Sequence, residues 1–358
     1  MEDKKEFQQT IVEIPHNNGK ATEEEFLSLL RLVAPGTQFR TALDGIVRVG
    51  KGALIVVENE LTLPIVDGGF KLNCKFTPQR MMELSKMDGG IILSKEMKRI
   101  LQANVLLTPD SKIPTNETGT RHKAAERTAK MAGTLVIAVS ERRNEISVYY
   151  KNKKHPLLDS NELLRKANEH IQLLDKQREL FDQHVERLDR AELQNYHDLP
   201  QALDVVQKGS MIQKIADDMQ RLFIELGKEG TMMKVRLKEI LTGVQQETDL
   251  VIKDYTKLDL RKSKTLLNSL SYEELLDKEN LRKALAHDGA TQGKHISGWR
   301  VLKRPSLADA EIALLIKEAG SLGKAINSKM QLYETLLGTE KANKFKDEIE
   351  RIKLSQFS

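Results

Sequence analysis

The segment Lys86–Leu93, KMDGGIIL, joins a helical pattern to a strand-like one. The apolar run after its two glycines is typical of a buried strand, so Asp88 is expected where that strand begins. The same tripeptide occurs earlier, in IVDGGF at Asp67–Gly69. There, strand-like residues stand on both sides, and an Asp-Gly pair between two strands predicts a β-hairpin. The first copy therefore has a structural explanation, whereas the second could hold a ligand.

The surroundings of this segment predict an α/β domain over residues 1–155. GALIVVE, GGIILS and GTLVIAVS are short apolar runs bounded by glycine or polar residues, as buried strands usually are. EEEFLSLLRLVAP and FRTALDGIVRVG have helical spacing, and further helices are expected near Pro78–Met87 and Thr120–Ala132. We therefore expect a mixed sheet with helices packed on it.

Beyond residue 155 the strand signals end. From Leu157 to about Lys257, apolar residues recur every three or four positions, which is typical of helices that pack on one another. The clearest stripe consists of Leu164, Ala167, Ile171, Leu174, Phe181, Val185 and Leu188. We expect an all-α helical spine over residues 156–285, which would serve packing, spacing or assembly. A small helical domain over residues 286–358 is expected to follow, with a linker at Ala286–Gly298.

Composition limits the possible functions. The 358-residue chain has a net charge of +5, and residues 291–358 hold 12 Lys and Arg against 8 Asp and Glu, so a polyanion would bind most easily near the C-terminus. Aromatic residues make up only 4%, which disfavours base-stacking platforms. The single cysteine, Cys74, excludes an intramolecular disulfide and a multi-cysteine zinc site, and suits a reducing cytoplasm. No apolar run reaches the ~20 residues of a membrane span, so no membrane partner is expected.

A basic helix start is predicted in ETGTRHKAAERTAK, Glu117–Lys130. Either threonine beside Gly119 could cap this helix, and the glycine would let a ligand approach the backbone. The first turn holds Arg121, His122 and Lys123, although helix N-termini prefer acidic residues. A bound phosphate would supply the missing negative charge. The alternative is a surface helix whose first turn is unfavourable by about 0.3–1 kcal/mol per charge.

Asp88 is the candidate for chemistry. A carboxylate held by the sheet at the start of a strand could bind a divalent cation and lower the barrier for a sugar hydroxyl to attack phosphorus. The two glycines after it would leave room for a base or a ribose. An ordinary Asp-Gly turn remains the commoner explanation for any single case.

Taken together, these stretches resemble the diadenylate cyclases, specifically the bacterial DNA-integrity scanning proteins. The resemblance covers nearly the whole chain, although it thins through the helical middle before it returns in SGWRVLKRP. It is dense in LVAPGTQFRTALDGIV, GALIVV, VDGGFKLNCKFTP, ELSKMDGGIILS, ILQANVLLTPD, ETGTRHKAAERTAK and LVIAVSERRNEISVYY. The order and spacing of so many blocks make a chance match very improbable.

The resemblance implies that two ATP molecules condense to cyclic di-AMP and pyrophosphate with Mg²⁺ or Mn²⁺. The family's Asp-Gly-Ala signature falls on Asp88-Gly89-Gly90, so the second tripeptide is expected to be the chemical one, with Asp88 as catalytic and metal-binding residue. The Arg-His-Arg signature falls on Arg121-His122-Lys123. The residues expected to bind the nucleotide are Gly89, Gly90, Leu107, Thr120, Arg121, His122, Lys123, Ala124, Ser140 and Arg142.

Three positions depart from the family pattern. Gly90 replaces alanine and loosens the turn beside Asp88, Ala124 replaces threonine and removes a hydroxyl, and Lys123 replaces arginine and loses a bidentate fork. Activity is expected to survive, because the aspartate, the first arginine and the histidine remain. A reduced rate or weaker ATP binding is expected, and a catalytically weak sensor of ATP or cyclic di-AMP is one alternative.

The C-terminal part resembles a helix-hairpin-helix module, which presents backbone N–H groups to DNA phosphates. The family's hairpin glycine pair falls on Leu336 and Gly338, so only one glycine is kept. The residues expected to contact DNA are Gly338, Lys341, Lys344 and Lys346. Trp299 and Arg300 match a Tyr-Arg pair of the family, and their simpler explanation is packing against the helical middle.

The resemblance also implies assembly. Two N-terminal domains would face one another, each with one ATP, and Asp88 would help to activate the ribose 3′-hydroxyl of the facing ATP. An octamer held largely through the helical middle is expected. Branched DNA is the expected macromolecular partner, with a role in the response to DNA damage and in repair. A mainly structural DNA-junction binder is the second alternative.

Overall fold

The computed structural model describes residues 21–194, 196, 198–256, 258–286, 298–305 and 307–357, without the side chains of 355–357. The predicted linker at Ala286–Gly298 lies almost wholly outside these residues. The chain divides into two compact units. The first contains the described residues up to Ala167 together with Gln220–Met232, and the second contains Asn168–Met219 and the described residues from Met233 onward.

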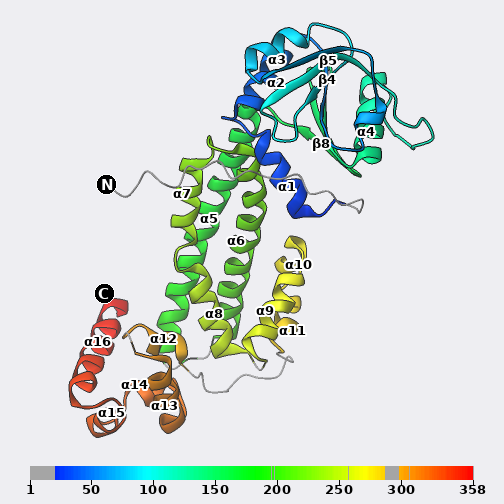
Figure 1. Ribbon diagram of the computed structural model, residues 1–358. Coiled ribbons are helices and arrows are strands. Elements are labelled where there is room, and N and C mark those ends of the chain that lie inside the picture. The colour runs from blue at the N-terminus through cyan, green and yellow to red at the C-terminus, as the bar shows by residue number, and fades with distance from the viewer. Residues whose placement is uncertain are drawn as a thin grey trace, which may run out of the picture. The chain divides into compact units, whose positions relative to one another are not determined.

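A mixed sheet forms the centre of the first unit, as predicted (Figure 1). Its eight strands run in the order β2-β5-β4-β1-β6-β7-β8, and β3 also pairs with β5. Strands β1 and β4 are parallel, whereas the other neighbours are antiparallel. The strands are β1 (Ala53–Val57), β2 (Val66–Asp67), β3 (Phe70–Lys75), β4 (Gly90–Leu93), β5 (Arg99–Leu107), β6 (Leu135–Val139), β7 (Ile146–Tyr150) and β8 (Lys153–Leu157).

Helices cover both faces of this sheet (Figure 1). Side chains alternate along a strand, so Ile55 and Ile91 pack with one set of helices, while Val56 and Ile92 pack with Ala125 on the other face. The central strands are apolar throughout because both faces are buried. The first set is α1 (Glu23–Leu32), α2 (Gln38–Arg48) and α3 (Pro78–Leu84), and the other face carries α4 (Thr120–Ala132).

The predicted hairpin at Asp67–Gly69 is wrong. In the described sheet, β2 and β3 both pair with β5, with Asp67 opposite Leu106 and Phe70 opposite Ala103. The register is the same on both sides, so the two glycines interrupt one edge strand without reversing it. Gly69 has a φ of +80°, and a Cβ there would lie 2.6 Å from the Ala103 carbonyl oxygen. Glycine is therefore needed for close strand contact and not for a chain reversal.

The helical middle and C-terminal part follow as predicted in class. The heptad stripe of α5 is confirmed at every seventh residue, because Ala167, Leu174, Phe181 and Leu188 are all buried. None of the described helices is long and apolar enough to cross a membrane. The helices are α5 (Ser160–Leu193), α6 (Leu199–Leu226), α7 (Thr231–Leu241), α8 (Val244–Tyr255), α9 (Leu260–Ser269), α10 (Tyr272–Leu276), α11 (Lys278–Ala284), α12 (Trp299–Lys303), α13 (Asp309–Ala319), α14 (Leu322–Ile326), α15 (Met330–Leu337) and α16 (Thr339–Phe357).

Candidate active site

Four strand ends meet at one end of the sheet. Gly90 at the start of β4 pairs with the start of β1 and with β5 near its end, and the end of β6 pairs with the start of β1. This end therefore carries Asp88 just before β4, Leu107 at the end of β5 and Ser140 just after β6. Arg142 lies in the exposed turn that follows. Residues more than 50 positions apart in sequence thus lie at the same end of these strands, which is called the site edge of the sheet.

The start of α4 lies at the site edge. A Cβ on Gly52, which precedes β1, would lie 2.0 Å from Arg121 Nη1, so the guanidinium rests against the start of that strand. The expected threonine cap at position 118 or 120 is wrong, because Gly119 is the N-cap and offers no side-chain hydrogen bond. The first turn also contains no acidic residue. Its N–H groups and its positive end therefore remain suited to an anion.

The first turn of α4 contains two permanent cations, Arg121 and Lys123. Within the described residues, neither Arg121 nor Lys123 forms an ion pair with a carboxylate. The two do not face the same way, since Ala125 marks the buried side of α4 and Lys123 stands about 200° round the helix axis from it. Arg121, four residues before Ala125, is on the sheet side. The sequence pattern treated the three basic residues alike. The fold distinguishes them, because Arg121 lies on the side of α4 that faces the sheet and Lys123 does not.

The two glycines after Asp88 differ in how strictly the structure requires glycine at their positions. Asp88 itself is exposed. Gly89 has a φ of +84°, and a Cβ there would lie 2.8 Å from the Val105 carbonyl oxygen, so only glycine fits. Gly90 has no such backbone requirement, and its Cβ would lie 3.3 Å from Val105 Cγ2. An alanine at position 90 would need a small shift of one side chain, so the glycine there leaves the strand start looser than it has to be.

Sequence reasoning missed the contacts that connect the segment just before α4 to strands β7 and β8. Glu117, two residues before the N-cap, accepts a hydrogen bond from the Tyr149 hydroxyl at 2.9 Å and pairs with Lys154 Nζ at 2.5 Å. Burial alone would raise the pKa of Glu117, but these two contacts outweigh it and the pKa is lowered. The His122 ring meets the Tyr149 ring edge-on at 6.4 Å. The only available sequence signal was the glutamate in ETGT, which nothing linked to β7 or β8.

His122 is half-buried beside this network. Burial lowers the pKa of its imidazole, and the negative charge of Glu117 opposes that shift only in part. The ring is therefore mostly neutral near pH 7, where it can donate or accept a hydrogen bond but adds little charge. Of the three predicted basic residues, Arg121 supplies the fixed cation at the site edge.

The donor set around Asp88 suits a metal shared with substrate. The described residues contain no group of three or more His, Cys, Asp or Glu that could hold a metal ion by itself. Mg²⁺ and Mn²⁺ are commonly held by one or two carboxylates together with substrate phosphates and water. A lone exposed carboxylate beside an uncapped, basic helix start fits that mode and does not fit a permanent, protein-only site.

Comparison with known proteins decides the family. Residues 40–154 match the family described as DisA bacterial checkpoint controller nucleotide-binding, and residues 157–293 match the DisA bacterial checkpoint controller linker region. The DNA integrity scanning protein DisA of Symbiobacterium thermophilum is 38% identical over 340 residues, which cover 92% of this chain and 96% of that protein. The chain belongs to the DisA family. It is a diadenylate cyclase, as the sequence resemblance implied.

Further relatives agree with this assignment. DisA of Acetivibrio thermocellus is 37% identical over 325 residues, covering 88% of this chain and 90% of that one. A solved chain of DacA from Staphylococcus aureus is 23% identical and covers 41% of this chain and 95% of its own, with a TM-score of 0.29. A score this low adds nothing to the assignment. Diadenylate cyclases generally use divalent metal ions, in keeping with the donor set at Asp88.

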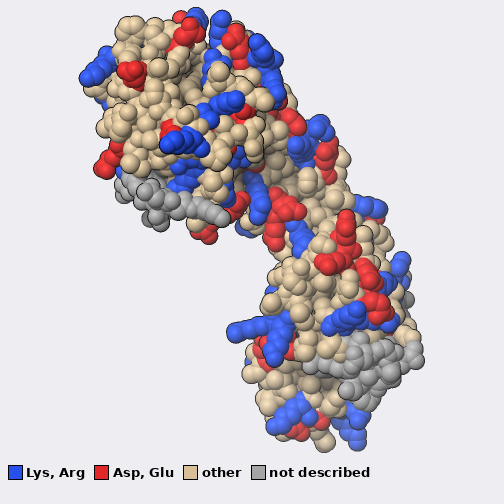
Figure 2. All heavy atoms as spheres, turned by 90° about the vertical axis from the view of Figure 1, so that its right-hand side faces the viewer, with Lys and Arg blue, Asp and Glu red and all other residues tan. Residues whose placement is uncertain are grey.

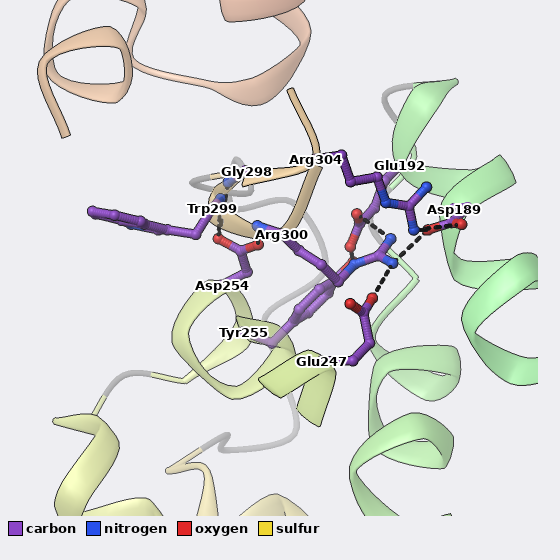
Figure 3. A network of polar contacts seen from close by, with 9 residues as sticks. All are labelled: Asp189, Glu192, Glu247, Asp254, Tyr255, Gly298, Trp299, Arg300 and Arg304. Carbon is purple, nitrogen blue, oxygen red and sulfur yellow. Dashed lines mark hydrogen bonds and ion pairs between the residues drawn. The ribbon is translucent and has the colours of Figure 1, made fainter. Parts of the chain in front are cut away.

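The second unit contains a buried charge network that sequence reasoning reduced to packing. Arg300 of α12 is 1% exposed, and its guanidinium pairs with Asp189 and Glu192 of α5 and with Glu247 of α8 (Figure 3). Glu192 also accepts a hydrogen bond from the Tyr255 hydroxyl at 3.0 Å. Arg300 therefore does pack against the helical middle, as the simpler explanation held, but through ion pairs and not through apolar contacts.

The same network caps α12. The Asp254 carboxylate accepts hydrogen bonds from the backbone N–H groups of Gly298, Trp299 and Arg300 at 2.8–2.9 Å (Figure 3). Burial raises the pKa of Asp254 to about 7, although the hydrogen bonds from the N–H groups of Arg300 and Trp299 oppose the shift. The Trp299 ring points away from the guanidinium cluster and lies under Lys253 Nζ. Both residues of the matched pair are thus engaged within the unit.

The residues expected to bind DNA lie around the junction of α15 and α16. Gly338 separates these helices with a φ of +82° and open space at its Cβ position. Lys341 pairs with Glu311 at 2.5 Å and Lys344 with Glu340 at 2.7 Å. Exposed pairs of this kind contribute little to stability, so a phosphate can displace them. On the face that Figure 2 shows, basic and acidic side chains are interspersed.

Proposed function

We propose that this diadenylate cyclase condenses two ATP molecules into cyclic di-AMP and pyrophosphate at the site edge of the sheet. The triphosphate would bind the N–H groups and Arg121 at the start of α4. Asp88 would help to activate the ribose 3′-hydroxyl of a facing ATP, whose oxygen attacks the α-phosphorus while pyrophosphate leaves. The single observation that carries this proposal is the meeting of Asp88 and an un-neutralised Arg121 at one end of one sheet.

The proposed nucleotide site keeps all the residues predicted from sequence. Backbone close to Gly89 and Gly90 would face the ribose, and Leu107 would contact the base. The residues proposed to line the site are Gly89, Gly90, Leu107, Thr120, Arg121, His122, Lys123, Ala124, Ser140 and Arg142. Ala124 and Lys123 leave fewer directed contacts than the threonine and arginine of the family would. A slower cyclase is therefore expected, and a weak enzyme that mainly senses nucleotide is the alternative.

Mg²⁺ or Mn²⁺ is the proposed cofactor. Asp88 would hold it together with the triphosphate, and its charge would stabilise negative charge on the phosphoryl oxygens. The protein's own part is to orient: α4 fixes the phosphates, and the sheet fixes the carboxylate. Replacing one ion by the other at constant ATP tests which is preferred.

Assembly is part of the proposal. Two attacks must occur in antiparallel order to close the ring, and one domain offers one Asp88 and one basic turn. Facing cyclase domains would supply both, and we propose an octamer held largely through the helical spine. Three domains, 1–155, 156–285 and 286–358, would divide catalysis, assembly and DNA binding, and the enzyme would act in the cytoplasm.

The two Asp-Gly-Gly copies provide the test. Asp88→Asn should lower cyclic di-AMP production at least about 100-fold while the thermal midpoint stays within a few degrees, because the carboxylate is exposed. Asp67→Asn is the matched control, since it makes the same change in an exposed residue of the same tripeptide. An active Asp88 variant beside an inactive Asp67 variant would reverse the choice between the copies.

Binding of branched DNA is a second proposal, supported by the basic C-terminal charge. A helix-hairpin-helix-like module at α15 and α16 would present Gly338 and the three lysines 341, 344 and 346 to phosphates. Deleting the residues from Gly298 onward is a poor test, because it removes Arg300 and leaves Asp189 and Glu192 buried without it. Substitution of the lysines keeps the network intact.

The DNA experiment uses the full chain. Changing Lys341, Lys344 and Lys346 to Gln should lower the slope of log affinity against log salt by about 2–3 on a four-way junction. The control changes three other exposed lysines of the second unit, Lys176, Lys238 and Lys262, to Gln. If both triple variants lower this slope equally, or if neither lowers it, the DNA-binding site does not lie at α15 and α16.

A further inference from the structure

The segment that leads into α4 is tied down at two places. The first tie comes from α4 itself, whose Arg127 Nε donates to the Ile113 carbonyl oxygen at 3.0 Å and whose Lys130 Nζ donates to that of Pro114 at 2.8 Å. These contacts hold the outer part of the segment to the middle of the helix. Thr115 Oγ1 also donates to Glu126 of α4 and accepts from the Glu117 backbone N–H at 3.1 Å, so this tie reaches the Glu117 backbone, whereas the Glu117 carboxylate is held separately.

The second tie comes from the sheet. Glu117 Oε1 receives the Tyr149 hydroxyl of β7 and the Lys154 ammonium of β8. Tyr149 is 1% exposed and packs with the α4 side of the sheet, so its hydroxyl is a fixed point. The Lys154 side chain is half-exposed and flexible, so it fixes the position of Glu117 less well than Tyr149 does. Only Thr118 separates this tie from the N-cap.

Tyr149 contacts the helix start a second time. Its ring meets the His122 ring edge-on at 6.4 Å, and Gly119, between the two contacts, has no side chain to hold it in place. The buried Tyr149 side chain therefore contacts both Glu117, two residues before the N-cap, and His122 in the first turn. Movement of this turn by about 1 Å would spoil phosphate contacts that depend on N–H direction.

We propose that Tyr149 and Glu117 are positioning residues for the nucleotide: their hydrogen bond fixes the start of α4, and with it Arg121 and His122, for the triphosphate. This inference rests on the proposed role of that helix start. Neither residue needs to touch ATP. Their contribution is to remove freedom that the glycine N-cap would otherwise leave to the turn, so that less order is lost when the phosphate binds.

Tyr149→Phe tests the proposal by removing one oxygen atom from a buried ring. The KM for ATP should rise about five- to tenfold, with kcat changed less than about twofold, and the Kd of a non-hydrolysable ATP analogue should rise in parallel. Glu117→Met, which offers no oxygen to accept from the Tyr149 hydroxyl, should act in the same direction. The double variant should be no worse than Glu117→Met alone, because both changes remove the same hydrogen bond.

Tyr150→Phe is the matched control, since Tyr150 is the next residue of β7, is equally buried and packs in the cluster on the other face of the sheet. It should change the thermal midpoint as much as Tyr149→Phe does but leave KM and Kd at wild-type values. Wild-type KM and Kd in Tyr149→Phe, or equal effects of the two tyrosine variants, would overturn the proposal. If the wild type makes no cyclic di-AMP, the proposed function fails instead, and the Kd comparison still decides the positioning role.

Discussion

Two arginines of this chain have opposite surroundings. Arg300 is buried, and three carboxylates from α5 and α8 surround its guanidinium. Arg121 is half-buried at the uncapped start of α4, rests against a glycine and has no ion pair within the described residues. Carboxylates of the chain surround the first cation, whereas the second has no carboxylate partner among the residues that the structure describes.

The difference teaches how to separate a structural charge from a functional one. A buried cation without partners would cost several kcal/mol, so evolution either surrounds it or exposes it. Arg300 shows the first solution. Arg121 shows neither, because it is partly covered and adds positive charge where the helix is already positive. Such an imbalance is tolerated best where a ligand restores the balance, which is why the phosphate is proposed there.

Replacing Arg300 should have the largest effect. Arg300→Met keeps an unbranched, flexible side chain but leaves Glu192 buried without its cation and Asp189 with only the partly exposed Arg304, so the free energy of unfolding of the second unit should fall by about 3–5 kcal/mol. Urea denaturation followed by circular dichroism measures it. Arg304→Met, which removes a partly exposed partner of Asp189, should cost about 1 kcal/mol or less. Equal losses would mean that burial is not what makes Arg300 different.

Replacing Arg121 should show the reverse pattern. Arg121→Met should lower kcat/KM for cyclic di-AMP formation by roughly 10–150-fold, equivalent to about 1.5–3 kcal/mol for a lost charge-assisted hydrogen bond. Thermal stability should stay the same or rise, since a cation leaves a helix N-terminus. Steady-state kinetics and a melting curve on the same sample measure both. A variant that loses stability but not activity would place Arg121 with Arg300 as a structural cation.

The smallest effect is expected at Lys123. Lys123→Arg restores the arginine of the family signature and should raise kcat/KM by about fivefold at most, since Lys123 projects from the side of α4 away from Ala125. Lys123→Met measures how much the present lysine contributes. If Lys123→Met is as damaging as Arg121→Met, the long lysine side chain reaches the same phosphate despite its place on the helix.

Much of the molecule could be predicted from local pattern. Apolar β-branched runs marked the buried strands, and the seven-residue recurrence that includes Leu174 and Phe181 marked the long α5. These signals are readable because periodicity depends only on how one segment meets the core. The placement of Asp88 at the start of β4 followed from the same signals, and family membership followed from the order of the motifs.

Other features were decided only by tertiary structure. The Asp-Gly pair at Asp67 predicted a hairpin, but pairing with β5 on both sides of it made one interrupted edge strand. The partners of Arg300 come from positions 53 to 111 residues earlier, and Tyr149 reaches Glu117 across 32 residues. No local pattern encodes such pairs, because their energy depends on which distant groups packing brings within hydrogen-bond distance. Sequence alone determined where the candidate site residues lie along the chain, and the fold determined which charged residues have ion-pair partners within the described part of the chain.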